Sequence, residues 1–484
     1  MAKAHTRQDK FNIYKKNCLD KWQKMRILAL NSYKMINIEQ ITEKITTLPI
    51  AEVGFESHFI KVPKILTAYS FVLGFFKTIS NGGECTLNMW AQNISLLGGS
   101  IFSKEALESR LGFSCVAFCE QLLGAAIEYG LKKGVSDCAC SDNSLQLSWA
   151  RTFNRVFVED STCFSLPDLM FPIFGGSANQ KAKYCIARVQ LRINLISEKI
   201  HRIALKKYGE NDKTFAGDIV DTLEPNDLII RDLGYHDLNV FERIIEKGAY
   251  FISRWFPRTV LLDTQTFKRI DLGKMLPKLQ KKGVELWEQN CLVGLEKKTR
   301  MRVIFIKLPI EVEQKRREDA LKKEKSKSIK YSKEYLALLG WSIYITNVPS
   351  WMLPMLDIWK IYTFRWRIEI IFKAWKSHLK LVSVLNDKGF LNPCHLLIRL
   401  YLMMIWVTLC LVPAYNFFQG KIYKSEKRFV SLAKFADFFR NNCVELVNER
   451  NWLRFIPFVK QFCLYDKRKK RKNMLEELYM LNLS

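Results

Sequence analysis

Four polar side chains recur at helical spacing late in the chain, and together they could bind a metal ion and phosphate groups. Tyr362 is followed three, seven and fourteen residues later by Arg365, Glu369 and Lys376. Because no glycine or proline interrupts this part of the chain, we predict one long helix, and at about 100° per residue the four side chains share one face. A carboxylate between two cations and a phenol suits a metal and phosphate site. The competing interpretation is a ladder of exposed salt bridges.

Two further carboxylates follow short apolar segments that we predict to be strands. The segment 153–158 ends in Glu159 and Asp160, and the segment 227–231 ends at Asp232. Side chains at strand ends leave the sheet and converge on one edge, so both aspartates are candidate metal ligands. Taken singly, each aspartate fits a turn or a helix cap better than a functional site.

The segments around these aspartates supply the rest of the predicted fold. Residues 187–195 alternate apolar and polar side chains, which indicates a half-buried strand. We predict an antiparallel partner at 199–206 and helices at 213–223 and 238–247, the second capped by Asp237. A charged stretch at 315–333 is predicted to be a solvated helix and loop. Four more strands are predicted, at 250–255, 259–263, 301–308 and 341–348.

The spacing of the four polar residues resembles the Tyr–Arg–Glu–Lys signature of bacterial insertion-sequence DDE transposases, the insertion sequence four family. The resemblance implies an α/β fold: a ribonuclease-H-like catalytic core interrupted by a β-rich insertion and flanked by helical N- and C-terminal regions. It also implies that Asp160, Asp232 and Glu369 are the catalytic residues and hold two Mg²⁺ ions, for which Mn²⁺ can substitute. An all-oxygen ligand set suits these hard cations.

The same resemblance assigns DNA-binding roles to five side chains. Tyr362, Arg365 and Lys376 would hold phosphates near the cleaved end, and Arg254 would do likewise. Trp341 would stack on a base that is flipped out near the transposon end, because an indole can stack on any base. A core tryptophan at the start of its strand is an equally good interpretation of Trp341.

The implied function is cut-and-paste DNA transposition. The protein would bind the terminal inverted repeats of its own insertion sequence, cleave the ends by metal-assisted phosphodiester hydrolysis, and join the 3′-OH ends to target DNA. Its partners would be double-stranded DNA, as transposon ends and as target, and a second copy of the chain in a homodimeric synaptic complex, with no membrane. The alternative is a transposase-derived DNA-binding protein that no longer cuts.

Charge and cysteine usage bound the function further. The net charge of +28 over 484 residues favours a polyanionic partner, nucleic acid first and an anionic membrane surface second. The apolar run 400–412 is shorter than the roughly 20 residues of a membrane span, so we predict a core helix. Thirteen cysteines without an apolar leader indicate reduced thiols in a cytosolic protein. The resemblance implies a location in the bacterial cytoplasm, associated with the nucleoid. Buried thiols are favoured over a zinc site at Cys115, Cys119, Cys138 and Cys140, whose spacing is atypical.

Five regions follow from these assignments: a helical DNA-end-binding region (1–150), the first part of the core (151–248), the β-rich insertion (249–350), the second part of the core with the catalytic helix (351–415), and a basic helical C-terminal region that is a candidate for dimerisation (416–484). In the first region, Ser103 is the predicted N-cap of a helix that completes a weak helix–turn–helix pattern. Lys104 and Arg110 could then contact DNA. An ordinary helical hairpin fits this pattern equally well.

Overall fold

The structure, a computed structural model, divides the chain into two compact units. The described residues are 48–61, 66–80, 85–136, 152–178, 183–195, 199–379, 392–442, 446 and 452–466. The basic C-terminal run 467–472 with the tail beyond it, and Cys138 and Cys140, lie outside these ranges.

The first unit comprises residues up to 126, 392–414 and 437–462, and its described elements are helical. The helices that belong wholly to it are α3 (Ile50–Glu56), α4 (Ala68–Ser80), α5 (Leu87–Gly98), α6 (Lys104–Glu108), α16 (Pro393–Trp406) and α20 (Ile456–Phe462). Three helices are shared between the units, α7 (Phe113–Ser136), α17 (Val412–Glu426) and α18 (Leu432–Asn441). Ser103 caps α6 as predicted, since its hydroxyl accepts a hydrogen bond from the backbone N–H of Ala106 at 3.1 Å. DNA contact by Lys104 and Arg110 stays a prediction.

The apolar run 400–412 is buried from Leu400 to Leu411, as predicted. It lies in α16 and in the π turn Val407–Leu411, which leads into α17. The segment Pro393–Glu426 is long and apolar enough to cross a membrane by length and composition, but 83% of its most apolar window is buried inside the chain. A helix that is apolar all round and covered by its own chain has the character of a core helix.

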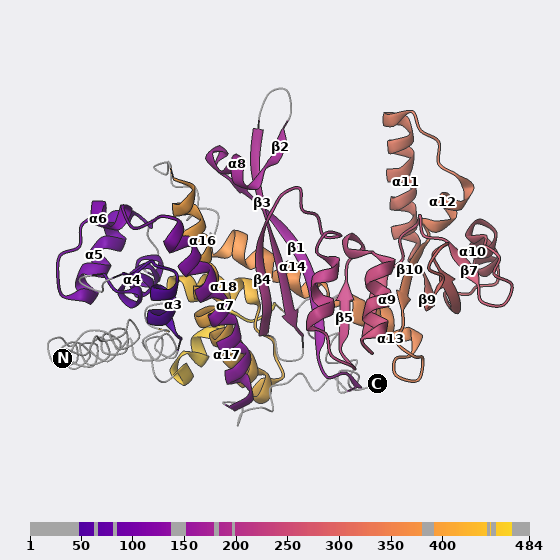
Figure 1. Cartoon of the computed structure of the whole chain (residues 1–484). Helices are drawn as coiled ribbons and strands as arrows, with labels where there is room; N and C mark the ends of the chain where they lie inside the picture. Colours follow the sequence, from indigo (N-terminus) through magenta and orange to yellow (C-terminus); the bar gives the residue numbers. More distant parts are fainter. Residues whose placement is uncertain are drawn as a thin grey trace, which may run out of the picture. The chain divides into compact units, whose positions relative to one another are not determined.

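The second unit is built on one ten-stranded mixed sheet (Figure 1). The strand order is β2-β3-β1-β5-β6-β10-β9-β8-β7, and β4 pairs with β3. The strands are β1 (Val156–Leu166), β2 (Gly176–Ala178), β3 (Lys183–Asn194), β4 (Lys199–Lys207), β5 (Leu228–Arg231), β6 (Tyr250–Arg254), β7 (Leu261–Asp263), β8 (Leu286–Val293), β9 (Thr299–Lys307) and β10 (Trp341–Thr346). Neither β2 nor β8 is predicted from the sequence. The strand β8 is hidden from a pattern search because Glu288, Gln289 and Asn290 interrupt its apolar residues.

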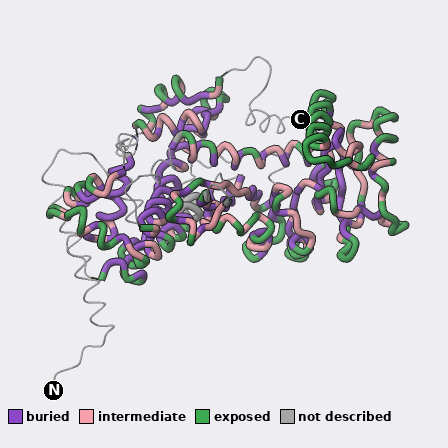
Figure 2. Tube along the Cα trace, turned by 90° about the horizontal axis from the view of Figure 1, so that it is seen from above, coloured by how far each residue is buried: buried purple, intermediate pink, exposed green. Residues whose placement is uncertain are grey.

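The helices of this unit lie on both faces of the sheet and at its β7–β10 end. They are α8 (Phe171–Phe174), η4 (Ala216–Thr222, a 3-10 helix), α9 (Leu238–Glu246), α10 (Leu272–Lys281), α11 (Ile310–Lys327), α12 (Lys333–Leu338), α13 (Met355–Thr363) and α14 (Trp366–Lys373). The predicted helix at 213–223 is therefore a shorter 3-10 helix. The prediction for α9 is confirmed, with Asp237 accepting hydrogen bonds from two backbone N–H groups of its first turn. The charged helix α11 is exposed along most of its length, as Figure 2 shows.

The strand β1 is longer than predicted, and Asp160 lies within it instead of ending it. β1 pairs in parallel with β5 only from Val156 to Glu159, whereas its antiparallel pairing with β3 continues to Leu166. The prediction was wrong because β3 keeps the polar residues after Glu159 extended. Asp160 is the first residue of β1 beyond the end of β5, and Asp232 directly follows β5.

Alternate side chains of β1 face two different layers. On one face, the helices η4 and α9 pack against Phe157 and its neighbours in the main buried cluster of this unit. On the other face, α14 packs against β1 and α13 against β6. Glu159 consequently points toward the first layer and Asp160 toward the second.

The single long helix predicted through the signature residues is wrong, because α13 and α14 are separated at Phe364 and Arg365. The break is a tight turn in which successive backbone N–H groups, including that of Arg365, donate to carbonyls three residues earlier. A π turn at Ala374–His378 follows α14 and carries Lys376. Both kinds of turn change the rotation per residue, so the four signature side chains do not share one straight face. The absence of glycine and proline permits a continuous helix but does not require one.

Candidate active site

Arg365 stands at the centre of the three predicted carboxylates. Its Nη1 donates to Asp160 Oδ2 at 2.6 Å and its Nη2 to Glu369 Oε1 at 2.7 Å. Its Nε lies 3.6 Å from Asp232 Oδ1. The structure thus gathers carboxylates from β1, from the turn after β5 and from α14 around one guanidinium.

Tyr362, at the end of α13, contacts the same cluster. Its hydroxyl donates to Asp232 Oδ1 at 3.0 Å, and its ring packs edge-on against Tyr344 of β10 with centroids 5.0 Å apart. Burial raises the pKa of the Tyr362 hydroxyl, and the neighbouring Asp232 charge raises it further. Tyr362 is therefore a neutral donor that can serve a carboxylate or a phosphate oxygen.

Asp160 is the most enclosed of the three carboxylates. Its side chain is 13% exposed, against 37% for Asp232 and 38% for Glu369. Burial raises the pKa of Asp160 to about 6 against the opposing effect of the Arg365 charge, and the nearby Asp232 carboxylate adds to the increase. Three carboxylates share one guanidinium here, so the cluster carries excess negative charge and attracts cations.

The donor chemistry of this cluster fits a hard divalent cation, because three carboxylates from three elements offer only oxygen ligands. The side chains are nevertheless not closed around an ion position. Among the residues that the structure describes, no three His, Cys, Asp or Glu side chains are close enough together to hold a metal as they stand. The Arg365 guanidinium lies between them, so a metal could bind here only if Arg365 moved away from Asp160 and Glu369.

Two other predicted phosphate-binding residues lie outside the carboxylate cluster. The Nζ of Lys376 lies 5.0 Å from the centroid of the Phe164 ring on β1, and burial lowers the pKa of this lysine. Arg254 ends β6 opposite Tyr344 on β10, where its charge acts on the hydroxyl of Tyr362. Neither cation touches the carboxylates of the cluster in any contact that the structure shows among its described residues.

Trp341 is part of the hydrophobic core of its unit. Its side chain is 3% exposed and packs within the main buried cluster, with the Nζ of Lys307 5.7 Å from the ring centroid. Stacking of this ring on a flipped base stays a prediction, and it would require Trp341 to leave the core.

A fourth carboxylate, Asp212, also lies near the cluster, although its place in the sequence does not predict this. Its Oδ1 accepts a hydrogen bond from the hydroxyl of Ser161, the residue after Asp160, at 2.5 Å. The charge of Asp212 contributes to the raised pKa of Asp160. Asp212 occupies a polar turn after β4, and no spacing or periodicity in that turn distinguishes it from an ordinary solvated residue.

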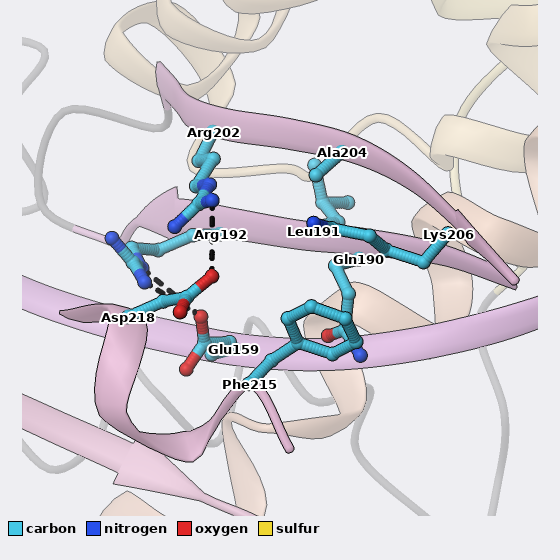
Figure 3. Close-up of a pocket in the computed structure, with 9 residues that line it drawn as sticks. All are labelled: Glu159, Gln190, Leu191, Arg192, Arg202, Ala204, Lys206, Phe215 and Asp218. Atoms are coloured by element: carbon cyan, nitrogen blue, oxygen red, sulfur yellow. Dashed lines mark hydrogen bonds and ion pairs between the residues drawn. The ribbon is translucent and has the colours of Figure 1, made fainter. Parts of the chain in front are cut away.

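The opposite face of β1 carries a second charged group, centred on Glu159. We call this face closed because the Glu159 carboxylate is already paired within the chain. Glu159 accepts hydrogen bonds from Arg192 Nη2 at 2.8 Å and from Arg231 Nη2 at 2.6 Å. Figure 3 shows Glu159 and Arg192 at a small pocket, beside the ion pair of Arg202 with Asp218 at 3.0 Å. Because its carboxylate is already held by two guanidinium groups, Glu159 is not available to bind a metal.

The chain is similar to known transposases. The family model described as the transposase DDE domain matches residues 151–403. The transposase for insertion sequence element IS231F of Bacillus thuringiensis subsp. israelensis is 28% identical over 68% of this chain and 69% of its own length. Similar matches are the IS231E transposase of Bacillus thuringiensis subsp. finitimus (25% identical, 79% of this chain and 80% of the relative) and the IS1151 transposase of Clostridium perfringens (26%, 77% and 80%).

The matched region begins just before β1 and ends within α16, so it contains Asp160, Asp232, Glu369 and the whole signature segment. The family resemblance inferred from residue spacing is therefore confirmed over more than half of the chain, and the chain belongs to the insertion-sequence transposases with a DDE domain.

Proposed function

We propose that this chain is an active cut-and-paste transposase that binds the terminal inverted repeats of its own insertion sequence. The observation that carries the proposal is the convergence of Asp160, Asp232 and Glu369, from three separate elements, on one guanidinium. Surplus carboxylates in a half-buried cluster are costly unless cations neutralise them. A cluster of this kind serves binding rather than stability.

The proposed catalytic core is ribonuclease-H-like. Its five strands are β4, β3, β1, β5 and β6 in spatial order, with β1, β5 and β6 parallel and β3 antiparallel to β1. The boundary predicted at 249 would put β6 in the β-rich insertion (249–350). We propose instead that the insertion starts after β6 and comprises β7 to β10, which continue the same sheet because β10 pairs with β6. This order puts Asp160 on β1 and Asp232 directly after the adjacent strand β5, which supports their pairing in one site.

The proposed reaction has two phosphodiester steps. In the first, water attacks the phosphorus at a transposon end, the bond to the 3′ oxygen breaks, and a 3′-OH is released. In the second, that 3′-OH attacks a phosphorus of target DNA and displaces its 3′ oxygen. Two Mg²⁺ ions, or Mn²⁺ in their place, would supply Lewis-acid activation of the attacking oxygen and stabilisation of the leaving oxygen. Asp160, Asp232 and Glu369 would hold them.

Arg365 has two roles in this proposal. Before DNA and metal arrive, its guanidinium neutralises part of the carboxylate charge. When a cation replaces it, Arg365 is free to turn to a phosphate oxygen, which its planar fork can bind in a bidentate manner. Tyr362 would likewise exchange its bond to Asp232 for a phosphate, while Lys376 and Arg254 supply positive charge at the edges of the site and Trp341 a base-stacking ring.

The remaining partners follow from the same proposal. Double-stranded DNA is bound at the transposon ends and at the target, two copies of the chain pair in the synaptic complex, and the protein works in the bacterial cytoplasm at the nucleoid. The net charge of +28 supports a DNA partner. The helical region 1–150 is the proposed end-binding part, and 416–484 the proposed dimerisation part.

The deciding experiment is an end-cleavage assay with purified protein and DNA that carries the flanking ends of its own element. Cleavage at those ends is expected in Mg²⁺, none in EDTA, and a loss of more than about 10³-fold in Glu369→Gln, as expected when a group that stabilises transition-state charge is removed. Glu311→Gln, on the exposed start of α11, is the matched control and should cleave normally. Specific end binding without cleavage in any metal would instead support a DNA-binding protein that no longer cuts.

A further inference from the structure

The turn between β4 and η4 holds a carboxylate that bonds to two strands at once. Asp212 Oδ1 accepts hydrogen bonds from Ser161 Oγ of β1 at 2.5 Å and from Gln190 Nε2 of β3 at 3.0 Å. Arg188 Nη1, also on β3, lies 3.2 Å from the same oxygen. Three donors on one oxygen, with a side chain only 22% exposed, distinguish Asp212 from a solvated turn residue.

One arm of this network reaches Asp160. The backbone N–H of Ser161 donates to Asp160 Oδ1 at 2.8 Å, while the hydroxyl of Ser161 is held by Asp212. The same residue therefore orients the Asp160 carboxylate with its backbone and is itself anchored through its side chain. Asp212 acts on Asp160 from the face of the sheet opposite Arg365.

A second arm reaches the turn that carries Asp232. A Cβ on Gly234 would lie 2.9 Å from Asp212 Oδ2, so the Asp212 carboxylate rests directly against this turn. The hydroxyl of Tyr235 donates to Gln190 Oε1, and the amide nitrogen of the same Gln190 donates to Asp212. The backbone after Asp160 and the backbone after Asp232 are thus tied to one carboxylate.

We propose that Asp212 is a positioning residue that fixes the separation of Asp160 and Asp232 for divalent-metal binding. The inference rests on the proposed function, since it assumes that these aspartates hold the metal. Groups that hydrogen-bond to metal ligands from behind typically change metal affinity by about 10–100-fold when removed. Asp212 acts one residue further back, on Asp160 through Ser161 and on the backbone after Asp232 through Gln190, Tyr235 and the Gly234 turn.

The test is a calorimetric titration of Mn²⁺ into the full-length, DNA-free protein. Asp212→Ala should weaken Mn²⁺ binding by about tenfold or more, because both arms lose their anchor. Asp212→Asn keeps an acceptor oxygen for the same three donors and should bind Mn²⁺ within about threefold of wild type. Tyr235→Phe removes only one hydroxyl and should weaken binding by a smaller factor than Asp212→Ala. The control is Asp221→Ala, a carboxylate 81% exposed in the following 3-10 helix, which should change nothing.

A second readout separates positioning from general damage to the fold. Asp212→Ala should raise the Mg²⁺ concentration needed for half-maximal end cleavage while its affinity for the DNA end in EDTA and its melting temperature stay close to wild type. The proposal is overturned if folded Asp212→Ala binds Mn²⁺ as tightly as wild type. It is also overturned if Asp212→Asn loses as much Mn²⁺ affinity as Asp212→Ala, because Asp212 would then be a metal ligand itself. If Asp212→Ala does not fold, an unchanged Mn²⁺ affinity in Tyr235→Phe overturns it instead.

The failure of the underlying function would look different. Asp160→Asn that binds Mn²⁺ as tightly as wild type would remove the metal site from these carboxylates and would overturn both proposals. A different outcome would overturn only the role of Asp212. In that case Asp160→Asn no longer binds Mn²⁺, which keeps the metal site at these carboxylates, but Asp212→Ala binds Mn²⁺ as tightly as wild type.

Discussion

Glu159 and Asp160 are consecutive residues of β1, yet they lie in opposite charge environments. Glu159 faces the α9 layer, 5% exposed, between two guanidinium groups that are 1% and 0% exposed. Asp160 faces α14 and shares a single guanidinium with two other carboxylates. Glu159 therefore has two cations to itself, whereas Asp160 shares one cation with two other anions.

The difference separates what holds the sheet together from what is available for binding. On the Glu159 side, burial alone would raise the pKa of the carboxyl, but the charges of Arg231 and Arg192 outweigh it and hold the pKa below its usual value. On the Asp160 side, burial prevails and the pKa rises. The charge of Glu159 is compensated by the chain itself, whereas the three carboxylates around Arg365 carry more negative charge than that guanidinium neutralises.

The largest expected difference between the faces is in stability. Glu159→Ala leaves Arg192 and Arg231 buried without a counter-charge, and should lower the free energy of unfolding by about 3–5 kcal/mol. Asp160→Ala should cost less than about 1 kcal/mol, because Arg365 keeps Glu369 and Asp232 as partners. Urea unfolding of the two variants at pH 7 measures both values, and equal losses would contradict the distinction between a closed and an open face.

The pH dependence of stability gives the next largest effect. Between the ordinary pKa of 3.8 and about 6, the folded protein keeps a proton on Asp160 that the unfolded chain has lost. Protonated Asp160 therefore adds about 2–3 kcal/mol to the free energy of unfolding. This stabilisation is complete below pH 4 and is lost as the pH rises to about 6. His201 and His236, whose pKa values burial lowers to about 4, act in the opposite direction in the same pH range.

To cancel the effect of these histidines, the free energy of unfolding of Asp160→Asn, which keeps both of them, is subtracted from that of the wild type. This difference in free energy of unfolding, measured without metal from pH 4 to pH 7, should fall as pH rises. A flat difference would show that Asp160 titrates normally and that its environment is not enclosed.

A smaller effect is expected on metal affinity when Arg365 is removed. Arg365→Ala should bind Mn²⁺ about tenfold more tightly than wild type in the absence of DNA, because a cation no longer has to displace a guanidinium from Asp160 and Glu369. End cleavage should nevertheless decrease, since a phosphate contact is lost. Calorimetry on Arg365→Ala, with the exposed Arg243→Ala as control, measures the change. Weaker binding in Arg365→Ala would mean that the guanidinium helps the metal site instead of competing with it.

The smallest effect is expected at the edge of the open face. Lys376→Ala should weaken binding of the transposon end by about 1 kcal/mol and reduce the slope of log affinity against log salt by about one, as for a single phosphate contact. Fluorescence anisotropy at several salt concentrations measures both. Lys274→Ala, an 80% exposed lysine of α10 paired with Asp271, is the control, and an equal slope change there would remove any special role for Lys376.

The parts of the site that depend on residue identity and spacing could be predicted from the sequence. They are the signature residues and the aspartate after β5, because each is defined within a few residues of chain. The break between α13 and α14 and the extension of β1 past Asp160 could not be predicted, because contacts with β3 and with the carboxylates decide them. Asp212 was hidden for the same reason, since its partner Ser161 lies 51 residues away in the chain.

Manganese anomalous scattering from crystals of the protein with Mn²⁺ and a transposon end tests the central claim most directly. We expect an anomalous peak at bonding distance from the oxygens of Asp160 and Asp232, with Glu369 close by and the Arg365 guanidinium withdrawn toward a phosphate. A peak on the Glu159 face alone, or no peak while Arg365 still bridges the carboxylates, would contradict the claim that the open face of β1 is a metal site.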